Sequence, residues 1–336
     1  MILKYINFLF YTVISFKNIP NPRFKYLSLV ELKILSQQHY SSCKVDDIAN
    51  HKFSVAPMME YTNCHQRYLF RLISKKSVLY TEMVVANALV RSENKERLLE
   101  ANFAEEEPLV LQLGGSDPND MKLAVKIASN YGYKQFNINC GCPSEKVAGA
   151  GCFGAALMLQ PELVSSLALA VYETSGKSAT IKCRLGVDDQ DSYEQLASFI
   201  TMVSTRGNVK HFIVHARKAI LNQNFSPHEN RNIPKLRYDY VYKLVNDFPN
   251  LSFTINGGIT NYTQIEDHFS NGVKGVMVGR SVINEPFYWN DIDHTIYNTK
   301  DANSLNRREI LFKYCDYADY IAVSYTHLTL PTSDLV

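Results

Sequence analysis

The chain has 336 residues, of which 46% are hydrophobic and 20% are charged, as in an ordinary globular protein. This length suits one large domain with an appendage, or two domains. A net charge of +2 does not mark the whole chain as a nucleic-acid binder, but one local basic face would be sufficient for binding. The seven cysteines show no paired framework, so we expect reduced thiols in an intracellular protein.

Cys140 and Cys142 are separated by a single residue, which is too close for an ordinary zinc half-site. No second cysteine pair accompanies them. We therefore expect no metal site.

Residues 1–50 differ in composition from the rest. The first acidic residue, Glu31, follows several basic ones, and a basic leader with few acids is typical of a transit peptide or signal sequence. The alternative is an extension without stable structure. The mostly apolar stretch 6–16 is too short to span a membrane, so we expect no membrane span. We expect a cytoplasmic location, or an organelle (mitochondrion or plastid) if residues 1–50 are a transit peptide.

From His51 onward, short apolar or β-branched runs alternate with helical blocks. The predicted strands are Phe53–Ala56, Val78–Glu82, Leu109–Leu113, Phe136–Asn139, Thr180–Arg184, Phe212–His215, Ser252–Asn256 and Gly275–Val278. The predicted helices are 118–131 with Asp117 as N-cap, 161–174, 191–206, 238–248 and 264–271.

Eight strands alternating with helices over about 250 residues predict an α/β fold, a (β/α)₈ TIM barrel. A doubly wound open sheet is the competing architecture, but the glycine-rich dinucleotide fingerprint is missing after the first strand. Polar residues follow nearly every predicted strand. In a barrel these residues meet at one rim, where barrel enzymes have their active sites.

The fourth predicted strand leads into Cys140-Gly141-Cys142-Pro143. This turn brings a thiol to the carboxyl end of a strand, so Cys142 is the candidate reactive group. The alternative is a small buried residue that fills a tight turn, which is how we interpret Cys140.

Lys182 lies inside a predicted buried strand, where a lysine needs a partner, and the anionic edge of a reduced flavin is a suitable one. The alternative is an outward-facing lysine with its amine in solvent. Gln112 suits the pyrimidine edge of a flavin, or bonds to backbone. His215 contacts a cofactor or substrate, or is structural. The glycine-rich turns with Gly257, Gly258, Gly279 and Arg280 suggest a phosphate site, or two ordinary turns.

Residues 217–237 form a long, basic segment after the sixth predicted strand. A long loop at this face of a barrel is a functional candidate, and its charge suits a phosphodiester backbone. The alternative is a solvated charged loop.

Together these residues resemble the tRNA-dihydrouridine synthase family, most closely its bacterial A-type branch. The similarity covers about residues 51–292. The matching stretches are SVAPMMEYTN, LYTEMV, LQLGGSDP, NINCGCPSEKV, IKCRLGVDD, HARKA, SPHENRNIP, INGGI and GVMVGR. The resemblance implies an FMN-binding TIM barrel with a C-terminal helical domain, which reduces tRNA uridines in the D-loop to 5,6-dihydrouridine with NADPH as reductant.

Carried over by position, the resemblance assigns residues to three roles. Cys142 is the proton donor to C5 of the uracil, after hydride from reduced FMN has added to C6. A thiol of ordinary pKa, about 8.5, is mostly protonated at neutral pH and can do this. The implied FMN contacts are Pro57, Met58, Met59, Gln112, Lys182, His215, Asn256, Gly257, Gly258, Gly279 and Arg280. The implied tRNA contacts are Asn139, His228 and Arg231, to which the basic character of the loop adds Arg217 and Lys218; the family usually has lysine where His228 stands.

We divide the chain into an extension (1–50), the barrel (51–300), the start of a helical tRNA-binding domain (301–323) and a non-native tail (324–336). The tail, SYTHLTLPTSDLV, lacks an amphipathic period, which suggests a truncated chain with exposed apolar surface near Trp289 and Phe312. We expect a monomer. The competing functions are an FMN barrel oxidoreductase for a small pyrimidine and a non-catalytic tRNA-binding barrel.

Overall fold

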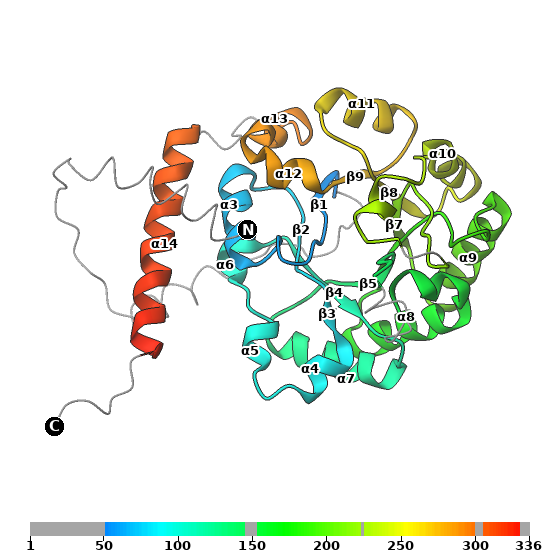
Figure 1. Cartoon of the computed structure of the whole chain (residues 1–336), viewed down its shortest axis with the longest axis horizontal. Coiled ribbons are helices and arrows are strands. Elements are labelled where there is room, and N and C mark those ends of the chain that lie inside the picture. Colours follow the sequence, from blue (N-terminus) through cyan, green and yellow to red (C-terminus); the bar gives the residue numbers. More distant parts are fainter. Residues whose placement is uncertain (1–50, 145–152, 223–224, 300–304, 330–336) are drawn as a thin grey trace. The chain divides into compact units, whose positions relative to one another are not determined.

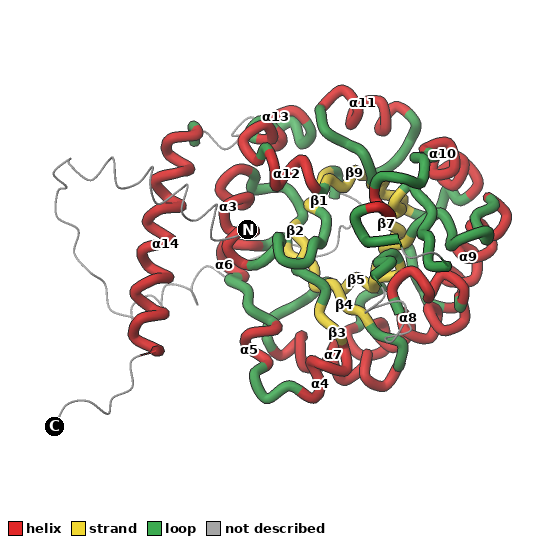
Figure 2. The backbone as a smooth tube through the Cα atoms, in the orientation of Figure 1, coloured by secondary structure: helices red, strands yellow, loops and turns green. Residues whose placement is uncertain are grey.

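The computed structural model describes residues 51–144, 153–222, 225–299 and 305–329, so the N-terminal extension lies outside the described residues. Within them, strands form a ring and helices surround it (Figure 1). The strands are β1 (Phe53–Val55), β2 (Leu79–Tyr80), β3 (Val84–Val85), β4 (Leu109–Gly114), β5 (Phe136–Cys140), β6 (Thr180–Cys183), β7 (His211–His215), β8 (Ser252–Asn256) and β9 (Gly275–Val278). Figure 2 shows the helices outside the strands.

All these strands pair in parallel, in the order β1-β9-β8-β7-β6-β5-β4-β2, with β3 also beside β4. A parallel bridge between Ser54 and Val78 joins the two ends of this order, and the Val55 N–H donates to the Val78 carbonyl at 2.9 Å. The barrel predicted from the sequence is therefore confirmed.

Of the predicted strand Val78–Glu82 only Leu79–Tyr80 forms a strand, β2, and the short strand β3 follows just beyond the predicted range. From Tyr80 to Val84 the chain advances four residues while its partner β4 advances three, from Val110 to Leu113. Such a mismatch interrupts pairing, as in a β-bulge. Glu82 lies in the gap and accepts a hydrogen bond from the Glu60 N–H.

The helices of the structure include the five predicted blocks, each reproduced to within two residues at each end, and others that lie outside those blocks. They are α3 (Cys64–Ile73), α4 (Ala86–Arg91), α5 (Lys95–Leu98), α6 (Phe103–Glu106), α7 (Pro118–Asn130), α8 (Pro161–Ser175), α9 (Tyr193–Arg206), α10 (Tyr238–Asp247), α11 (Tyr262–Ser270), α12 (Arg280–Asn284), α13 (Ile292–Thr295) and α14 (Arg307–Thr329), with 3₁₀ turns η3 (Gly154–Leu159), η4 (Glu229–Arg231) and η5 (Pro286–Trp289). Asp117 caps α7 as predicted, accepting from the Asn119 and Asp120 N–H groups. The capping box of Ser192 and Gln195 makes α9 begin at Tyr193.

Apolar side chains form two layers. The inner one fills the barrel with Ala56, Val78, Tyr80, Val110, Ile213 and Met277. The larger outer one lies between the strands and the helices. Trp289 belongs to it and is fully buried, with its ring 5.4 Å from that of Phe53. Trp289 is therefore not itself part of an exposed apolar surface, but its neighbour Tyr288 is 44% exposed and Phe312 is 50% exposed.

The last described helix, α14, packs on α3 through aromatic side chains. The rings of Tyr68 and Tyr317 stack with centroids 4.0 Å apart, and the Tyr317 hydroxyl lies 2.8 Å from His65 Nδ1. The helix continues to Thr329, beyond the predicted end at Val323. The reason is that the chain has no helix breaker before Pro331.

Candidate active site

The register of the strands brings the predicted site residues together at the carboxyl ends of neighbouring strands. Asn139 on β5 is level with Lys182 on β6. His215 on β7 is level with Asn256 on β8. These side chains therefore share the mouth of the barrel.

Cys142 lies two residues beyond β5, in a turn held by a single side chain. The Asn139 carboxamide oxygen accepts from the N–H groups of Gly141 and Cys142 at 3.0 and 2.9 Å. The Cys142 carbonyl accepts from the Ala155 N–H at 2.8 Å. Cys142 itself is half-buried, whereas Cys140 is fully buried, and burial raises the pKa of the Cys140 thiol well above its usual range. The interpretation of Cys140 as a packing residue is confirmed.

A chain of buried amides supports this turn from inside the barrel. Asn139 Nδ2 donates to Gln112 Oε1 at 2.9 Å, and Gln112 Nε2 donates to Asn137 Oδ1 at 2.7 Å. Asn137 Nδ2 in turn donates to Thr180 Oγ1 at 2.8 Å. Both ends of the Gln112 amide are thus engaged with neighbouring side chains. Gln112 and Asn139 stay predicted cofactor and tRNA contacts, but their hydrogen bonds in this structure orient the Cys142 turn.

Lys182 points inward, and its alternative orientation toward solvent is wrong. Its Nζ donates to Asn256 Oδ1 at 3.0 Å, and Asn256 Nδ2 donates to the Met277 carbonyl at 2.8 Å. Burial, and then the nearby Arg184 guanidinium, lower the pKa of Lys182 to about 8. No carboxylate forms an ion pair with Lys182 among the described residues, so its ammonium is suited to an anionic ligand.

The surroundings of His215 favour its neutral form. Burial lowers its pKa well below the usual range, and four cationic side chains at the mouth lower it further. These are Arg184, Lys182, Arg217 and Arg280. A neutral imidazole can donate from one nitrogen and accept at the other.

The glycines of the two predicted phosphate turns lie against other site residues. Gly257 and Gly258 have φ values of +116° and +74°, which L side chains rarely adopt. A Cβ on Gly257 would lie 2.7 Å from the His215 ring. Gly279 borders Met58, whose sulfur would lie 3.5 Å from a Cβ there. Pro57 is half-buried beside them, and Met59 is 55% exposed.

The basic loop 217–237 uses part of its charge internally. Arg217 donates to the carbonyls of Asn232 and Pro234. Lys218 donates to the Asp188 carbonyl at 2.8 Å and forms an ion pair with Asp191 at 3.3 Å. These two predicted tRNA contacts therefore fasten the loop.

At the mouth of the barrel one histidine and two arginines are exposed: His228, Arg231 and Arg280. Arg280 Nη1 reaches the loop and donates to Asn232 Oδ1 at 2.9 Å. Repulsion from Arg280 contributes, after burial, to lowering the pKa of both Arg217 and Arg231. Cations that repel one another at one rim favour a polyanionic ligand.

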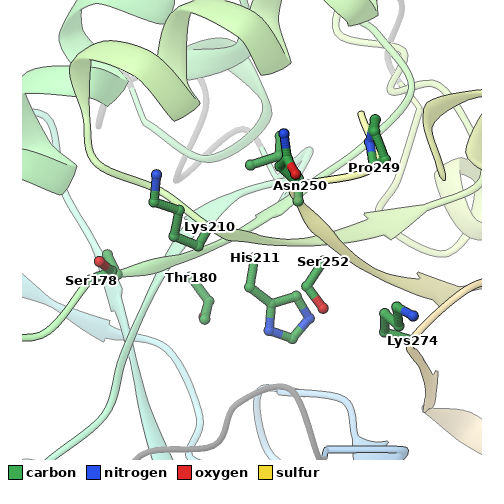
Figure 3. A pocket seen from close by; sticks show the side chains of 10 residues that line it. Ser178, Thr180, Lys210, His211, Pro249, Asn250, Ser252 and Lys274 are labelled. Carbon is green, nitrogen blue, oxygen red and sulfur yellow. The ribbon is translucent and has the colours of Figure 1, made fainter. Parts of the chain in front are cut away.

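A hollow of about 340 Å³ lies at the opposite end of the barrel (Figure 3), where β6, β7 and β8 begin. It is lined by Thr180, His211 and Ser252 with Lys210 and Lys274 at its edge. None of the predicted site residues lines it. The candidate site is therefore the mouth, where the strand-end side chains meet.

Other kinds of site find no support in the described part of the chain. No group of three or more His, Cys, Asp and Glu side chains there could hold a metal ion. Nor does any helix among these residues combine the length and the apolarity that crossing a bilayer requires.

Two buried residues of the site were given no role in the predictions from the sequence. Arg184 is 2% exposed and donates to the Gly141 carbonyl, and Asn230 is fully buried within the basic loop, where it bonds to Ile220. The sequence could have indicated Arg184 by its position, because it is a charged residue two places after Lys182 and directly after a buried strand.

Comparison with known proteins identifies the family. The model of the family described as "Dihydrouridine synthase (Dus)" matches residues 54–328. A tRNA-dihydrouridine(20/20a) synthase of Synechocystis sp. is 43% identical over 274 residues, covering 81% of this chain and 80% of that protein. The protein of the same name from Escherichia coli K12 is 41% identical over 274 residues, covering 82% and 78%.

Among solved structures, a complex of 2-naphthoyl-CoA reductase with 2-naphthoyl-CoA is similar with a TM-score of 0.56. It is 8% identical and covers 72% of this chain and 49% of that chain, so the likeness concerns the fold alone. The family match and the close relatives confirm the resemblance stated above, including its A-type branch. The chain belongs to the dihydrouridine synthase family of flavin-dependent oxidoreductases.

Proposed function

We propose that this chain reduces uridine to 5,6-dihydrouridine at positions 20 and 20a of tRNA, with FMN as cofactor, NADPH as reductant and Cys142 as proton donor. The positions come from the names of its relatives. The observation that carries the proposal is the placement of Cys142 in a fixed turn at a mouth that is lined by cations.

The residues of the mouth fit a flavin mononucleotide. Gly257 and Gly258 form a glycine turn beside His215 in a backbone conformation that other residues rarely adopt, and Arg280 can pair with a phosphate. Lys182 is half-buried and has no carboxylate partner among the described residues, and a flavin ring edge that gains negative charge on reduction would be a suitable partner. Pro57, Met58, Met59, Gln112, Asn256 and Gly279 complete the proposed cofactor contacts.

When bound, reduced flavin supplies a hydride that is accepted at C6 of the uracil ring. Charge then develops at C5 in conjugation with the C4 carbonyl. Cys142 gives its Sγ proton to C5, and the amide chain through Asn139 keeps the thiol turn in place while it does so. Asn137 and Thr180 extend this support into the barrel.

The substrate base has to leave its stack to reach this mouth, and loop uridines require the least energy for this. Arg231 and His228 are exposed at the rim and can contact the tRNA backbone. Arg217 and Lys218 hold the loop that carries Arg231 and His228. The positive charges of Arg217 and Lys218 add to the positive potential at the rim.

The proposal is tested by incubating the purified chain with unmodified tRNA, FMN and NADPH and measuring dihydrouridine at each position by mass spectrometry. We expect product at positions 20 and 20a, and a loss of about 10²-fold or more in rate for Cys142→Ala, because the proton donor is removed.

Cys140→Ala is the matched control, since it removes a thiol two residues away that faces the packed core. It should lower stability by about 1 kcal/mol and leave the rate close to normal. A Cys142→Ala chain with the unaltered rate would refute the role of Cys142. Reduction of free uracil in place of tRNA would refute the proposed substrate.

A further inference from the structure

Arg184 directly follows β6 and is 2% exposed, yet it forms no ion pair with a carboxylate among the described residues. A buried arginine usually has an acidic partner. Here backbone carbonyls take that place. Arg184 Nε donates to Gly141 at 3.0 Å, and Nη1 donates to Lys218 at 2.9 Å and to Asn230 at 2.8 Å.

The three carbonyls belong to the two segments that the proposed reaction uses. Gly141 directly precedes Cys142. Lys218 and Asn230 lie in the basic loop, where Asn230 directly precedes Arg231 and exchanges hydrogen bonds with Ile220. One buried side chain thus joins the thiol turn to the loop that faces the substrate.

The charge of Arg184 also acts on Cys142. Burial, and then repulsion from Arg231 and Arg217, lower the pKa of Arg184 to about 10, while attraction to the anionic form of Cys142 opposes this. Among the described residues, Lys182 on β6 and Arg231 on the loop also interact with Cys142. Arg184 differs from Arg231 in being buried and fixed by three hydrogen bonds.

We propose that Arg184 is a positioning residue of the reaction: it locks the Cys142 turn against the basic loop, and its fixed charge stabilises the thiolate that forms on Cys142. This inference rests on the proposed role of Cys142. In the step concerned, the Sγ–H bond breaks and a C5–H bond forms on the uracil ring, which has accepted a hydride at C6. The electron pair of the S–H bond stays on sulfur, beside the guanidinium.

Charge and geometry can be separated by two substitutions. Arg184→Gln removes the charge and keeps a hydrogen-bond donor, whereas Arg184→Lys keeps the charge and loses the planar fork that reaches several carbonyls. We measure the pH dependence of Cys142 alkylation by iodoacetamide, read at the Cys142 peptide by mass spectrometry, in the full chain. The kcat and KM for tRNA reduction are measured alongside.

In Arg184→Gln we expect the midpoint of alkylation to rise by about one pH unit, because the thiolate loses a buried positive charge. We expect kcat to fall about 10- to 100-fold. In Arg184→Lys the midpoint should stay near its normal value while the KM for tRNA rises, since the loop loses its anchor.

Arg237→Gln is the control. It removes another arginine of the loop, one whose guanidinium pairs with Asp191 and lies over the Tyr240 ring. It should leave the alkylation midpoint unchanged.

An unchanged midpoint in a folded Arg184→Gln chain overturns the proposal. If that variant does not fold, Arg184→Lys decides: a normal midpoint with a raised KM supports the proposal, and a midpoint raised by about one unit or an unchanged KM overturns it. The failure of the proposed function is recognised separately, because Cys142→Ala would then reduce tRNA at the normal rate whatever the alkylation midpoints are.

Discussion

At the scale of single residues, the proposed cofactor site depends on backbone that carries no side chain. Gly258 has a φ of +74°, and a Cβ there would lie 2.6 Å from Leu236 Cδ1 and 2.9 Å from the Tyr238 hydroxyl. That hydroxyl already donates to the Gly257 carbonyl at 2.7 Å. A side chain at Gly258 would therefore disturb the hydrogen bond that holds its own turn.

Gly258→Ala should destabilise the chain by about 2–4 kcal/mol, from the left-handed backbone and the steric overlap together, and weaken FMN binding. Gly176→Ala is a matched control, because Gly176 has a φ of +70° with nothing within 4 Å of the added Cβ. It should cost only about 1 kcal/mol. Urea unfolding and flavin titration of both variants measure these effects. Equal destabilisation by the two substitutions would contradict the role of Leu236 and Tyr238.

At the scale of elements, the sequence was sufficient to predict the barrel because strands and helices leave local periodic signals. The glycine-rich turns and Lys182 could be located in the same way, since each occupies a fixed place after or within a strand. The amide chain from Thr180 to Asn139 and the contacts of Arg184 could not. They join residues far apart in sequence, 43 positions between Arg184 and Gly141, and leave no local pattern.

The docking of α14 is a second feature that periodicity could not predict, because it depends on stacked aromatic rings. Tyr317→Ala removes both the stack on Tyr68 and the hydrogen bond with His65. We expect faster amide hydrogen exchange throughout Arg307–Thr329, with the exchange of the barrel strands unchanged. Val323→Ala, at a position that is 58% exposed, should leave the exchange of α14 as it is. Equal protection of α14 in both variants would show that Tyr317 does not hold the helix.

At the scale of the whole molecule, the site makes the stability of the folded chain depend on pH. Lys182 has an ordinary pKa of 10.5 and a pKa of about 8 when folded. Between these values the unfolded chain binds more protons than the folded chain, so the free energy of unfolding rises with pH. This contribution is fully present above pH 10.5 and is lost as the pH falls through 8.

Lys182→Met should remove this slope. In this variant the Asn256 oxygen loses its hydrogen-bond donor, which lowers the free energy of unfolding by an amount that does not depend on pH. Other titrating groups, such as Arg184, are present in both chains, so their contributions cancel in the comparison. The stability of the unaltered chain relative to Lys182→Met, measured by urea unfolding without flavin, should therefore increase from pH 8 to pH 10. If the free energies of unfolding of the two chains changed with pH in parallel, the pKa of Lys182 would not be lowered by folding. Added FMN should reduce the pH dependence of this stability difference, because an anionic partner raises the pKa of Lys182 toward its ordinary value. The positive charge of Lys182, which destabilises the folded chain without flavin, then stabilises the complex with FMN.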